Sequence, residues 1–348
     1  MNNNGSYDFL CSMSNLILAW RKARKNKTTN KDVVEFERNL EKNLLELHEE
    51  LKNKTYKPKP LTIFVLKDPK TRVISKSYFR DRIVHHAIIL VIGNLFERQF
   101  IYDSCSNQIG KGSSFAIERF KLFSRKITIN FKEHAFCLKA DIKHYFEEVD
   151  HKILIKIISR RVNDKNILFL IETILKSNTI QFGGKRLRGM PLGNYTSQFF
   201  GNVYLHDLDY FVKHILKVEY YIRYVDDFVI FHSSKKQLEI WKNKIDEFLK
   251  EKLKIQLHPQ KSRIIPLSRG IDFVGFRNFP YYRLLRKRNI RNMKRKIELF
   301  RKGAIDFKTL ADSYQGWQAY AIWGNTHNLR KRIKAEIIDL IWDRINFE

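Results

Sequence analysis

Two adjacent carboxylates, Asp226 and Asp227, lie in the middle of an otherwise apolar stretch of this sequence. Residues 220–222 before them and 228–231 after them are all apolar or aromatic. Such runs predict two strands that form a hairpin hinged on the Asp226-Asp227 pair. Two like charges this close are costly to bury unless a divalent cation neutralises them. The pair therefore indicates a metal site, and the alternative is an exposed β-turn, in which Asp-Asp is ordinary.

A third carboxylate, Asp141, ends a second apolar segment, which begins at Phe136 and predicts another short strand. Taken alone, Asp141 is an ordinary strand-end aspartate that caps a turn. Together with the hairpin pair it completes the set that two Mg²⁺ ions need for an in-line phosphoryl displacement, where the metals stabilise the attacking and leaving oxygens. Magnesium takes few carboxylates and fills its other positions with water and substrate phosphates, so three acidic residues are enough.

The charge of the chain indicates a polyanionic partner. Its 348 residues include 66 Lys and Arg against 37 Asp and Glu, which gives a net charge of +29. Binding to nucleic acid releases condensed counterions, so such an excess favours phosphate-rich partners. Hydrophobic residues make up 43% of the chain and aromatic residues 13%, which is enough to bury a core. The composition therefore excludes a disordered basic tail. We therefore expect a nucleic-acid-binding protein, and the alternatives are a basic solubility surface or a ribosome-like scaffold.

The sequence lacks the patterns of membrane, secretory and disulfide-rich proteins. The longest apolar run, residues 87–96, has about half the length of a membrane span. The first residues lack the basic and apolar pattern of a signal peptide. The three cysteines, Cys11, Cys105 and Cys137, are too far apart for a disulfide framework or a zinc site. We therefore expect a cytoplasmic protein with no membrane partner.

Hydrophobic periodicity and turn residues predict the elements that must position the carboxylates. Apolar residues three and four apart indicate helices, short continuous apolar runs indicate strands, and prolines mark element ends. We expect two helices over 14–54, strands over 61–66 and 72–74, a buried helix over 83–100, a strand over 136–142, a helix over 151–161 capped by Asp150, a helix over 196–217, the hairpin over 220–231 and basic helices after Pro280.

Two basic segments, Arg21–Lys27 and Leu285–Lys302, predict where the excess charge meets its partner. In the second segment nine of eighteen residues are Lys or Arg, and an apolar stripe runs from Ile290 to Phe300 between them. We expect both segments to contact the phosphates of a nucleic-acid duplex or of a structured RNA, which positions the nucleic acid without specifying its sequence. The alternative is that both are ordinary solvated helix faces.

Five motifs of this sequence, in this order, resemble those of bacterial and phage reverse transcriptases. The motifs are Leu138–Phe146, Gly189–Gln198, Tyr224–Asp227, Leu257–Ser262 and Phe273–Phe276. The resemblance implies the right-hand polymerase fold of the α+β class, with fingers, a palm of antiparallel sheet plus helices, and a helical thumb. It implies an N-terminal helical extension over 1–57, fingers over 58–135, a palm over 136–280 with 160–190 joining the fingers, and the helical thumb over 281–348.

The resemblance also implies the roles of the catalytic residues. Asp141 and Asp226 would be the main ligands of two Mg²⁺ ions, for which Mn²⁺ can substitute. The Ile142 carbonyl and Asp227 would lie beside them. Lys261 would protonate the leaving pyrophosphate, a step that general-acid catalysis by a lysine can supply.

The same resemblance implies five nucleotide-binding residues. Lys67 and Arg72 would grip the triphosphate, which suits the point charge of lysine and the forked guanidinium of arginine. Phe146 would abut the 2′-OH of a ribonucleotide and so favour deoxynucleotides. Gly193 would let the backbone approach the base, and Gln198 belongs to the same motif. The alternatives are a solvated basic turn for the first two residues and a plain core aromatic for Phe146.

The reaction that the resemblance implies is RNA-directed DNA synthesis, in which a primer 3′-OH attacks the α-phosphate of a dNTP. The implied partners are template RNA, primer or cDNA, dNTPs, a structured noncoding RNA and an accessory protein. One rival is an RNA-dependent RNA polymerase, against which Phe146 argues. The other is a catalytically silent RNA-binding scaffold, against which the three aspartates argue.

The segment Leu192–Gln198 indicates a branch of the family. Its Leu-Gly-x-x-x-Ser-Gln form is similar to that of diversity-generating retroelement enzymes, which belong to the group II intron-related clade, and it departs from the Gln-Gly of retroviral enzymes. Defence-associated reverse transcriptases, which work with a noncoding RNA, share much of this pattern and are the alternative. Either branch would be bacterial or phage-encoded.

Overall fold

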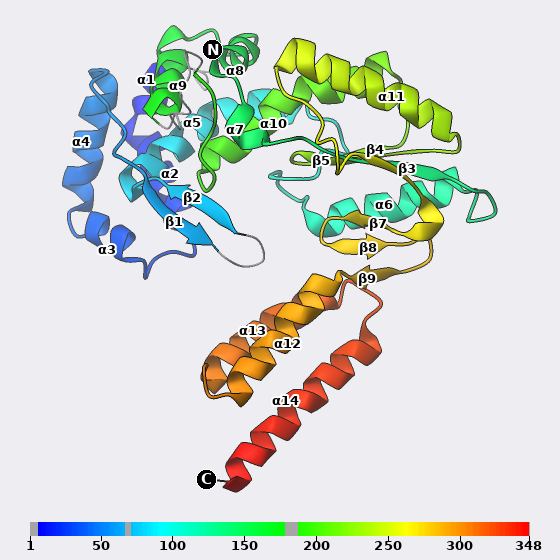
Figure 1. Ribbon diagram of the computed structural model, residues 1–348. Coiled ribbons are helices and arrows are strands. Elements are labelled where there is room, and N and C mark those ends of the chain that lie inside the picture. The colour runs from blue at the N-terminus through cyan, green and yellow to red at the C-terminus, as the bar shows by residue number, and fades with distance from the viewer. Residues whose placement is uncertain (1–5, 67–70, 178–186, 348) are drawn as a thin grey trace.

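The computed structural model describes residues 6–66, 71–177 and 187–347 of the chain. It combines helices with antiparallel sheets, which confirms the expected α+β class. Figure 1 shows a body of helices and a central sheet, from which the C-terminal helices project. No helix in the described ranges is both long enough and apolar enough to cross a membrane.

The N-terminal helices pack around α5 (Phe79–Glu97), which is buried on most sides as its apolar sequence predicts. Their bounds are Tyr7–Cys11 for α1, Met13–Arg24 for α2, Lys31–Glu37 for α3 and Leu40–Lys52 for α4. The apolar stripe from Val33 to Leu51, which predicts one helix, is divided at Asn39. The φ of −127° and ψ of 49° at Asn39 lie outside the helical region. Asparagine favours such positions because its side chain competes with helical hydrogen bonds.

A separate antiparallel hairpin follows these helices. It consists of β1 (Thr62–Leu66) and β2 (Arg72–Lys76), close to the strands expected there, and Thr62 pairs with Lys76. All the residues of β1 are exposed. The hairpin therefore stands apart from the central sheet and leads into α5 (Figure 1).

The central sheet has four antiparallel strands in the order β4-β5-β3-β6. Their bounds are Phe136–Asp141 for β3, Tyr221–Tyr224 for β4, Asp227–His232 for β5 and Arg263–Pro266 for β6. Alternate side chains of β5 enter different hydrophobic clusters, Phe228 and Ile230 on one face, Val229 and Phe231 on the other. Helix α11 (Lys235–Phe248) covers the first face and α6 (Ser113–Ile127) the second (Figure 1).

Further helices connect these strands. Their bounds are Tyr145–Glu148 for α7, His151–Ser159 for α8, Lys165–Ser177 for α9, Tyr195–Tyr210 for α10, Phe211–Ile215 for the π-helix η1, Leu249–Leu253 for the π-helix η2 and Leu267–Arg269 for the 3₁₀-helix η3. The Asp150 side chain accepts a hydrogen bond from Ile153 N, which confirms the predicted cap of α8.

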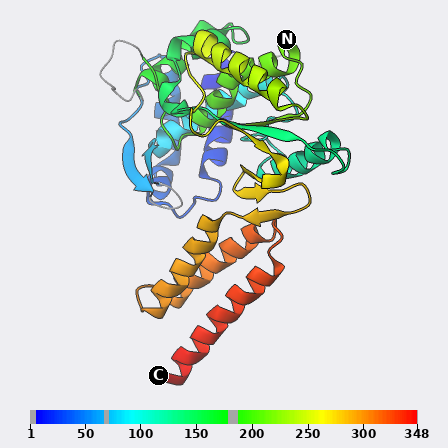
Figure 2. The ribbon, with the colours of Figure 1, turned by 45° about the vertical axis from the view of Figure 1, so that its right-hand side comes forward.

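A small sheet and a group of helices complete the chain. The bounds are Ile271–Phe273 for β7, Phe276–Asn278 for β8, Arg283–Leu285 for β9, Lys287–Arg301 for α12, Phe307–Ala321 for α13 and His327–Phe347 for α14. Met293, Ile297 and Phe300 are buried, which confirms the inner stripe of α12. The strand β9 lies where only helix was expected, because its pairing with β8 is not visible in the local pattern. Figure 2 shows α12, α13 and α14 extending away from the central sheet and from the small sheet of β7, β8 and β9. The boundaries of extension, fingers, palm and thumb stay predictions.

Candidate active site

The hairpin between β4 and β5 turns on Val225 and Asp226, one residue earlier than the sequence predicts. Tyr224 pairs with Asp227, so Asp227 is the first residue of β5. Val225 has a φ of 59°, a left-handed conformation that is unfavourable for a β-branched residue. Strain of this kind costs on the order of 1–3 kcal/mol and persists only where the surroundings impose it.

Arg223 provides the contacts that impose this turn. Its side chain is completely buried although it belongs to β4. Its Nη1 donates to the Val225 carbonyl oxygen at 3.0 Å and to Asn202 Oδ1 at 3.1 Å. Its Nη2 donates to Ser104 Oγ at 3.2 Å. The strained turn is therefore tied to α10 and to the segment around Ser104.

Asp209 of α10 neutralises the Arg223 guanidinium. Arg223 Nε lies 2.7 Å from Asp209 Oδ1, and Nη2 lies 2.6 Å from Oδ2. Both side chains are 0% exposed, and the Tyr221 hydroxyl donates to Asp209 Oδ1 at 2.8 Å. This two-point geometry is the strong form of a charge-assisted hydrogen bond. It gives the buried guanidinium a fixed position in contact with the Val225 carbonyl oxygen of the turn.

Strand β3 brings Asp141 beside the same turn. Asp141 pairs with Asp227 across the sheet, and Ile142 N donates to the Asp226 carbonyl oxygen at 3.2 Å. Burial, and next the negative charge of Asp141, raise the pKa of the Asp226 carboxyl. Burial raises the pKa of Asp227 to about 6, although the ammonium of Lys139 forms an ion pair with it. The three aspartates and Ile142 thus lie together at one edge of the sheet.

These donors fit a divalent cation whose shell is completed by a substrate. Within residues 6–66, 71–177 and 187–347, no three His, Cys, Asp or Glu side chains form a ready-made metal site. Asp141 and Asp226 nevertheless repel each other in a partly buried position, and a cation between them would relieve that repulsion. Magnesium is often held by one or two carboxylates and substrate phosphates, so a preformed cluster is not required.

The segment after η2 places Lys261 against Asp141. His258 N donates to the Asp141 carbonyl oxygen at 2.7 Å, and Asp141 N donates to Ser262 Oγ at 3.3 Å. Lys261 Nζ lies 3.2 Å from Asp141 Oδ1, and about half of the lysine side chain is exposed. An ammonium in this position can reach a ligand bound at Asp141. Its role as a proton donor stays a prediction.

Gly193 lies against the β1–β2 hairpin. Its φ is 113°, and a Cβ at this position would lie 2.8 Å from Ile74 Cγ2. The neighbouring Leu192 carbonyl oxygen accepts a hydrogen bond from Ser75 N at 2.9 Å. A side chain here would push the hairpin away, so this close approach requires glycine.

The other predicted nucleotide-binding residues have different surroundings. Phe146 is partly buried, with its ring centroid 5.1 Å from that of Tyr145, a position that suits both a gate and a core aromatic. Arg72 is exposed at the start of β2, and Gln198 is exposed on α10. Lys67 lies outside the described residues. The roles of all these residues stay predictions.

Sequence reasoning missed Lys139, Arg223 and Asp209. Lys139 and Arg223 each interrupt a short apolar strand, and Asp209 lies on a largely buried helix. A charged residue within an apolar strand is seldom buried unless it is paired. That interruption is the sequence signal that could have identified Lys139 and Arg223.

A family model described as reverse transcriptase (RNA-dependent DNA polymerase) matches residues 58–278, more than half of the chain. The chain belongs to the reverse transcriptase family. The predicted family and its enzyme class, that of RNA-directed DNA polymerases, are thereby confirmed.

Curated relatives are similar to most of this reverse transcriptase-family chain. Protein YkfC of Escherichia coli (strain K12) is 25% identical over 279 residues, which are 70% of this chain and 71% of that protein. Group II intron-encoded protein LtrA of Lactococcus lactis subsp. cremoris is 23% identical over 303 residues. That match covers 68% of this chain and 49% of LtrA, so the chain spans about half the length of LtrA.

Solved structures with a similar backbone include a telomerase. The apo telomerase from Candida tropicalis, truncated from its C-terminal domain, is 15% identical, with a TM-score of 0.49. The match covers 68% of this chain and 58% of that chain.

We predict that Arg223→Met alone lowers the free energy of unfolding by about 3–5 kcal/mol, because it leaves Asp209 as an uncompensated buried charge. The double variant Arg223→Met with Asp209→Leu should recover most of this loss, since it removes both charges. Urea unfolding followed by circular dichroism measures each change.

The matched control is Arg160→Met. It breaks the exposed ion pair between Arg160 and Asp207, and Asp207 lies on α10, the helix that also carries Asp209. Exposed pairs contribute at most about 1 kcal/mol, so this variant should unfold almost like the wild type. If Arg160→Met and Arg223→Met lowered the free energy of unfolding equally, the buried pair would not be more important to the fold than an exposed one.

Proposed function

We propose that this chain extends a primer 3′-OH with dNTPs while it copies an RNA template. The observation that carries the proposal is the convergence of Asp141 and Asp226 on a strained turn held by buried Arg223. A pair of partly buried carboxylates is unfavourable without a cation. Two Mg²⁺ ions bound at these carboxylates would stabilise the attacking 3′-oxygen and the leaving oxygen of the α-phosphate.

The side chains of the site would divide the remaining work. The carboxylates of Asp141 and Asp226 are the proposed main ligands, with the Ile142 carbonyl and Asp227 beside them. Lys261, 3.2 Å from Asp141, is in a position to donate a proton to the leaving pyrophosphate. In phosphoryl transfer, positioning and charge neutralisation supply nearly all the catalysis.

The incoming nucleotide would lie between the β1–β2 hairpin and the carboxylates. The support for this is the contact of Gly193 with the hairpin, which joins the two elements that would enclose the base. Arg72, at the start of β2, and Lys67 would hold the triphosphate. Phe146 would exclude the 2′-OH of a ribonucleotide.

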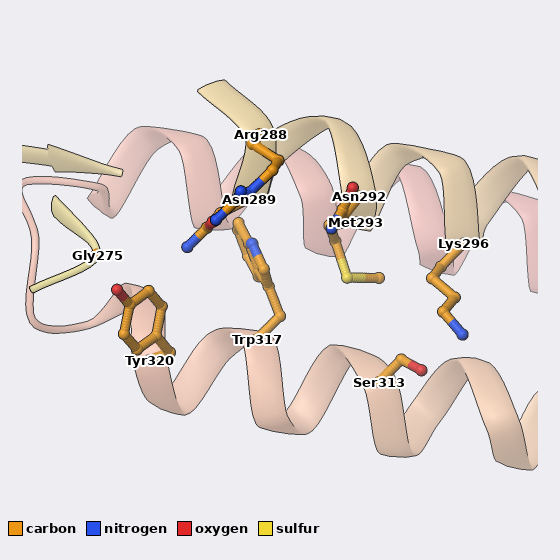
Figure 3. A pocket seen from close by; sticks show the side chains of 9 residues that line it. All are labelled: Gly275, Arg288, Asn289, Asn292, Met293, Lys296, Ser313, Trp317 and Tyr320. Carbon is orange, nitrogen blue, oxygen red and sulfur yellow. The ribbon is translucent and has the colours of Figure 1, made fainter. Parts of the chain in front are cut away.

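A cavity of about 550 Å³ between α12 and α13 supports binding of a template–primer duplex. Figure 3 shows Arg288 and Asn292 of α12 and Trp317 and Tyr320 of α13 around it, next to Gly275. A Cβ on Gly275 would lie 1.8 Å from Tyr320 Oη, so the β7–β8 turn and the helix are in direct contact. Cationic and amide groups beside aromatic rings suit a sugar–phosphate backbone.

We predict that Asp226→Asn reduces primer extension on an RNA template about a thousandfold, since metal ligation supplies several kcal/mol of transition-state stabilisation. Incorporation of labelled dNTPs measures the rate. The fold should survive, because the substitution removes a partly buried charge and keeps the side-chain shape.

Asp207→Asn is the matched control, as it neutralises an aspartate of α10 that lies outside the site. It should extend primers like the wild type. If Asp226→Asn combined with Asp227→Asn left primer extension unchanged, the metal assignment would be wrong and the scaffold alternative would gain support.

We predict that Phe146→Ala raises incorporation of ribonucleotides relative to deoxynucleotides about 10–100-fold, because a missing ring no longer excludes the 2′-OH and steric pockets discriminate by about 1–3 kcal/mol. Single-nucleotide extension with dNTP or NTP measures the ratio. Phe146→Tyr keeps the ring and should keep the wild-type ratio. An unchanged ratio in Phe146→Ala would leave Phe146 as a core aromatic only.

We further propose that the enzyme acts in a diversity-generating retroelement, together with a structured template RNA and an accessory protein. The support is the Leu-Gly-x-x-x-Ser-Gln form of Leu192–Gln198. The alternative role, in defence with a noncoding RNA, uses the same polymerase chemistry.

The nucleic acids that copurify with the protein distinguish these roles. We expect cDNA that matches a single template RNA except for errors at adenines, detected by sequencing both strands. Repetitive or non-templated DNA would contradict the retroelement role and favour the defence role.

A further inference from the structure

A second cavity, of about 300 Å³, opens beside the segment that follows Asp141. Its polar lining consists of Lys143, His144, Glu148, Lys250, Lys254 and Gln256. Its volume lies at the lower end of the range for small-ligand pockets, about 300–1,000 Å³. The cavity is thus large enough for a small ligand, and most of its ionisable lining is basic.

The positive charge of this cavity is only partly matched by acids. Lys250 pairs with Asp246, and the Glu148 carboxylate is 2.8 Å from Arg188. Over the described ranges of the chain, Lys143 and Lys254 form no ion pair with an acid. Two lysines of the cavity lining therefore have no acidic partner in the described part of the chain.

The backbone of both walls is locally strained. His144 has a φ of 46° and Lys254 a φ of 54°, both in the left-handed region. Lys254 also ends the π-helix η2. π-helical turns and left-handed residues other than glycine are uncommon and concentrate at functional sites. Here they turn the chain so that the Gln256 carbonyl oxygen accepts a hydrogen bond from Lys143 N at 3.0 Å.

The same two walls continue into the candidate active site. Ile142 pairs with Leu257, directly beside the Lys143–Gln256 hydrogen bond. One residue further along, His258 N donates to the Asp141 carbonyl oxygen, and Lys261 Nζ contacts Asp141 Oδ1. The cavity and the carboxylates therefore share the segments 141–144 and 254–261, with Lys261 on the second of them.

We propose that this cavity binds pyrophosphate, the product that leaves when a primer 3′-oxygen displaces it from a dNTP. The proposal rests on the function proposed above, since that reaction releases pyrophosphate beside Asp141. Pyrophosphate carries several anionic oxygens, and lysine ammonium groups bind phosphate as compact point charges. After Lys261 has donated its proton, the released pyrophosphate would move into the cavity and bind to Lys143 and Lys254.

Calorimetric titration of the full chain with inorganic pyrophosphate tests the site directly. The titration contains a chelator and no nucleic acid, so that only side chains can bind the anion. We expect Lys143→Gln with Lys254→Gln to weaken binding at least about tenfold, because two charge-assisted contacts are lost. Lys252→Gln is the matched control, an exposed lysine of η2 that does not line the cavity, and should bind like the wild type.

Two results of this titration would overturn the proposal. One is wild-type affinity for pyrophosphate in the double variant. The other is equally tight binding of inorganic phosphate, because a site for a diphosphate should prefer the longer anion.

Inhibition of primer extension by added pyrophosphate separates this proposal from the proposed function. The double variant should need about tenfold more pyrophosphate for half-inhibition, in line with its weaker binding. Inhibition at the wild-type concentration would overturn the product site. A third outcome is that the wild-type chain does not extend primers but binds pyrophosphate, and that the double variant loses this binding. That outcome would support the anion site and overturn only the polymerase assignment.

Discussion

The buried ion pair between Arg223 and Asp209 is the interaction on which the candidate active site depends. Desolvation of each charge costs several kcal/mol, which two-point pairing and the hydrogen bonds from Tyr221 and to Asn202 offset. Apolar side chains of similar volume would fill the same space with less cost. Only a donor such as the guanidinium, however, can hold the Val225 carbonyl oxygen. We therefore interpret the pair as fixing the position of the turn rather than as a source of stability.

Neighbouring cations are distributed unequally among the three aspartates. Lys139 pairs with Asp227 and Lys261 contacts Asp141, whereas Asp226 forms no ion pair with a residue in the described part of the chain. Of the three, Asp226 is therefore the one whose negative charge has no ion-pair partner in that part of the chain, and Asp141 lies beside it. This is a physical reason to propose the metal ions at Asp226 and Asp141 and to give Asp227 the supporting position that the motif resemblance implies.

The features that local sequence could predict are those whose cause is local. The apolar run that ends at Asp141 predicted β3, and the position of Asp150 before an apolar stripe predicted its cap. The predicted hinge of the β4–β5 hairpin was wrong by one residue, because Val225 adopts a backbone conformation that is unfavourable for valine. The Arg223 pair could not be predicted, since its partners come from α10 and from Ser104, 119 residues away. Motif resemblance found the acids but not the charges that hold them.

The basic residues that produce the net charge of +29 have different surroundings in two parts of the chain. In the N-terminal helices, Arg24 pairs with Glu37 and Arg80 with Glu50, so basic residues there join neighbouring helices. Helix α12 differs, because it contains seven Lys and Arg and a single acid, Glu298, and of these basic residues Arg301 also contacts Glu336 of α14. Its apolar stripe is buried, which directs the remaining basic side chains outward. An excess of basic residues on one helix favours a polyanionic partner, and phosphates along a duplex could balance this charge over the length of the helix. Helix α12 is therefore a stronger candidate for the proposed duplex contact than the N-terminal helices.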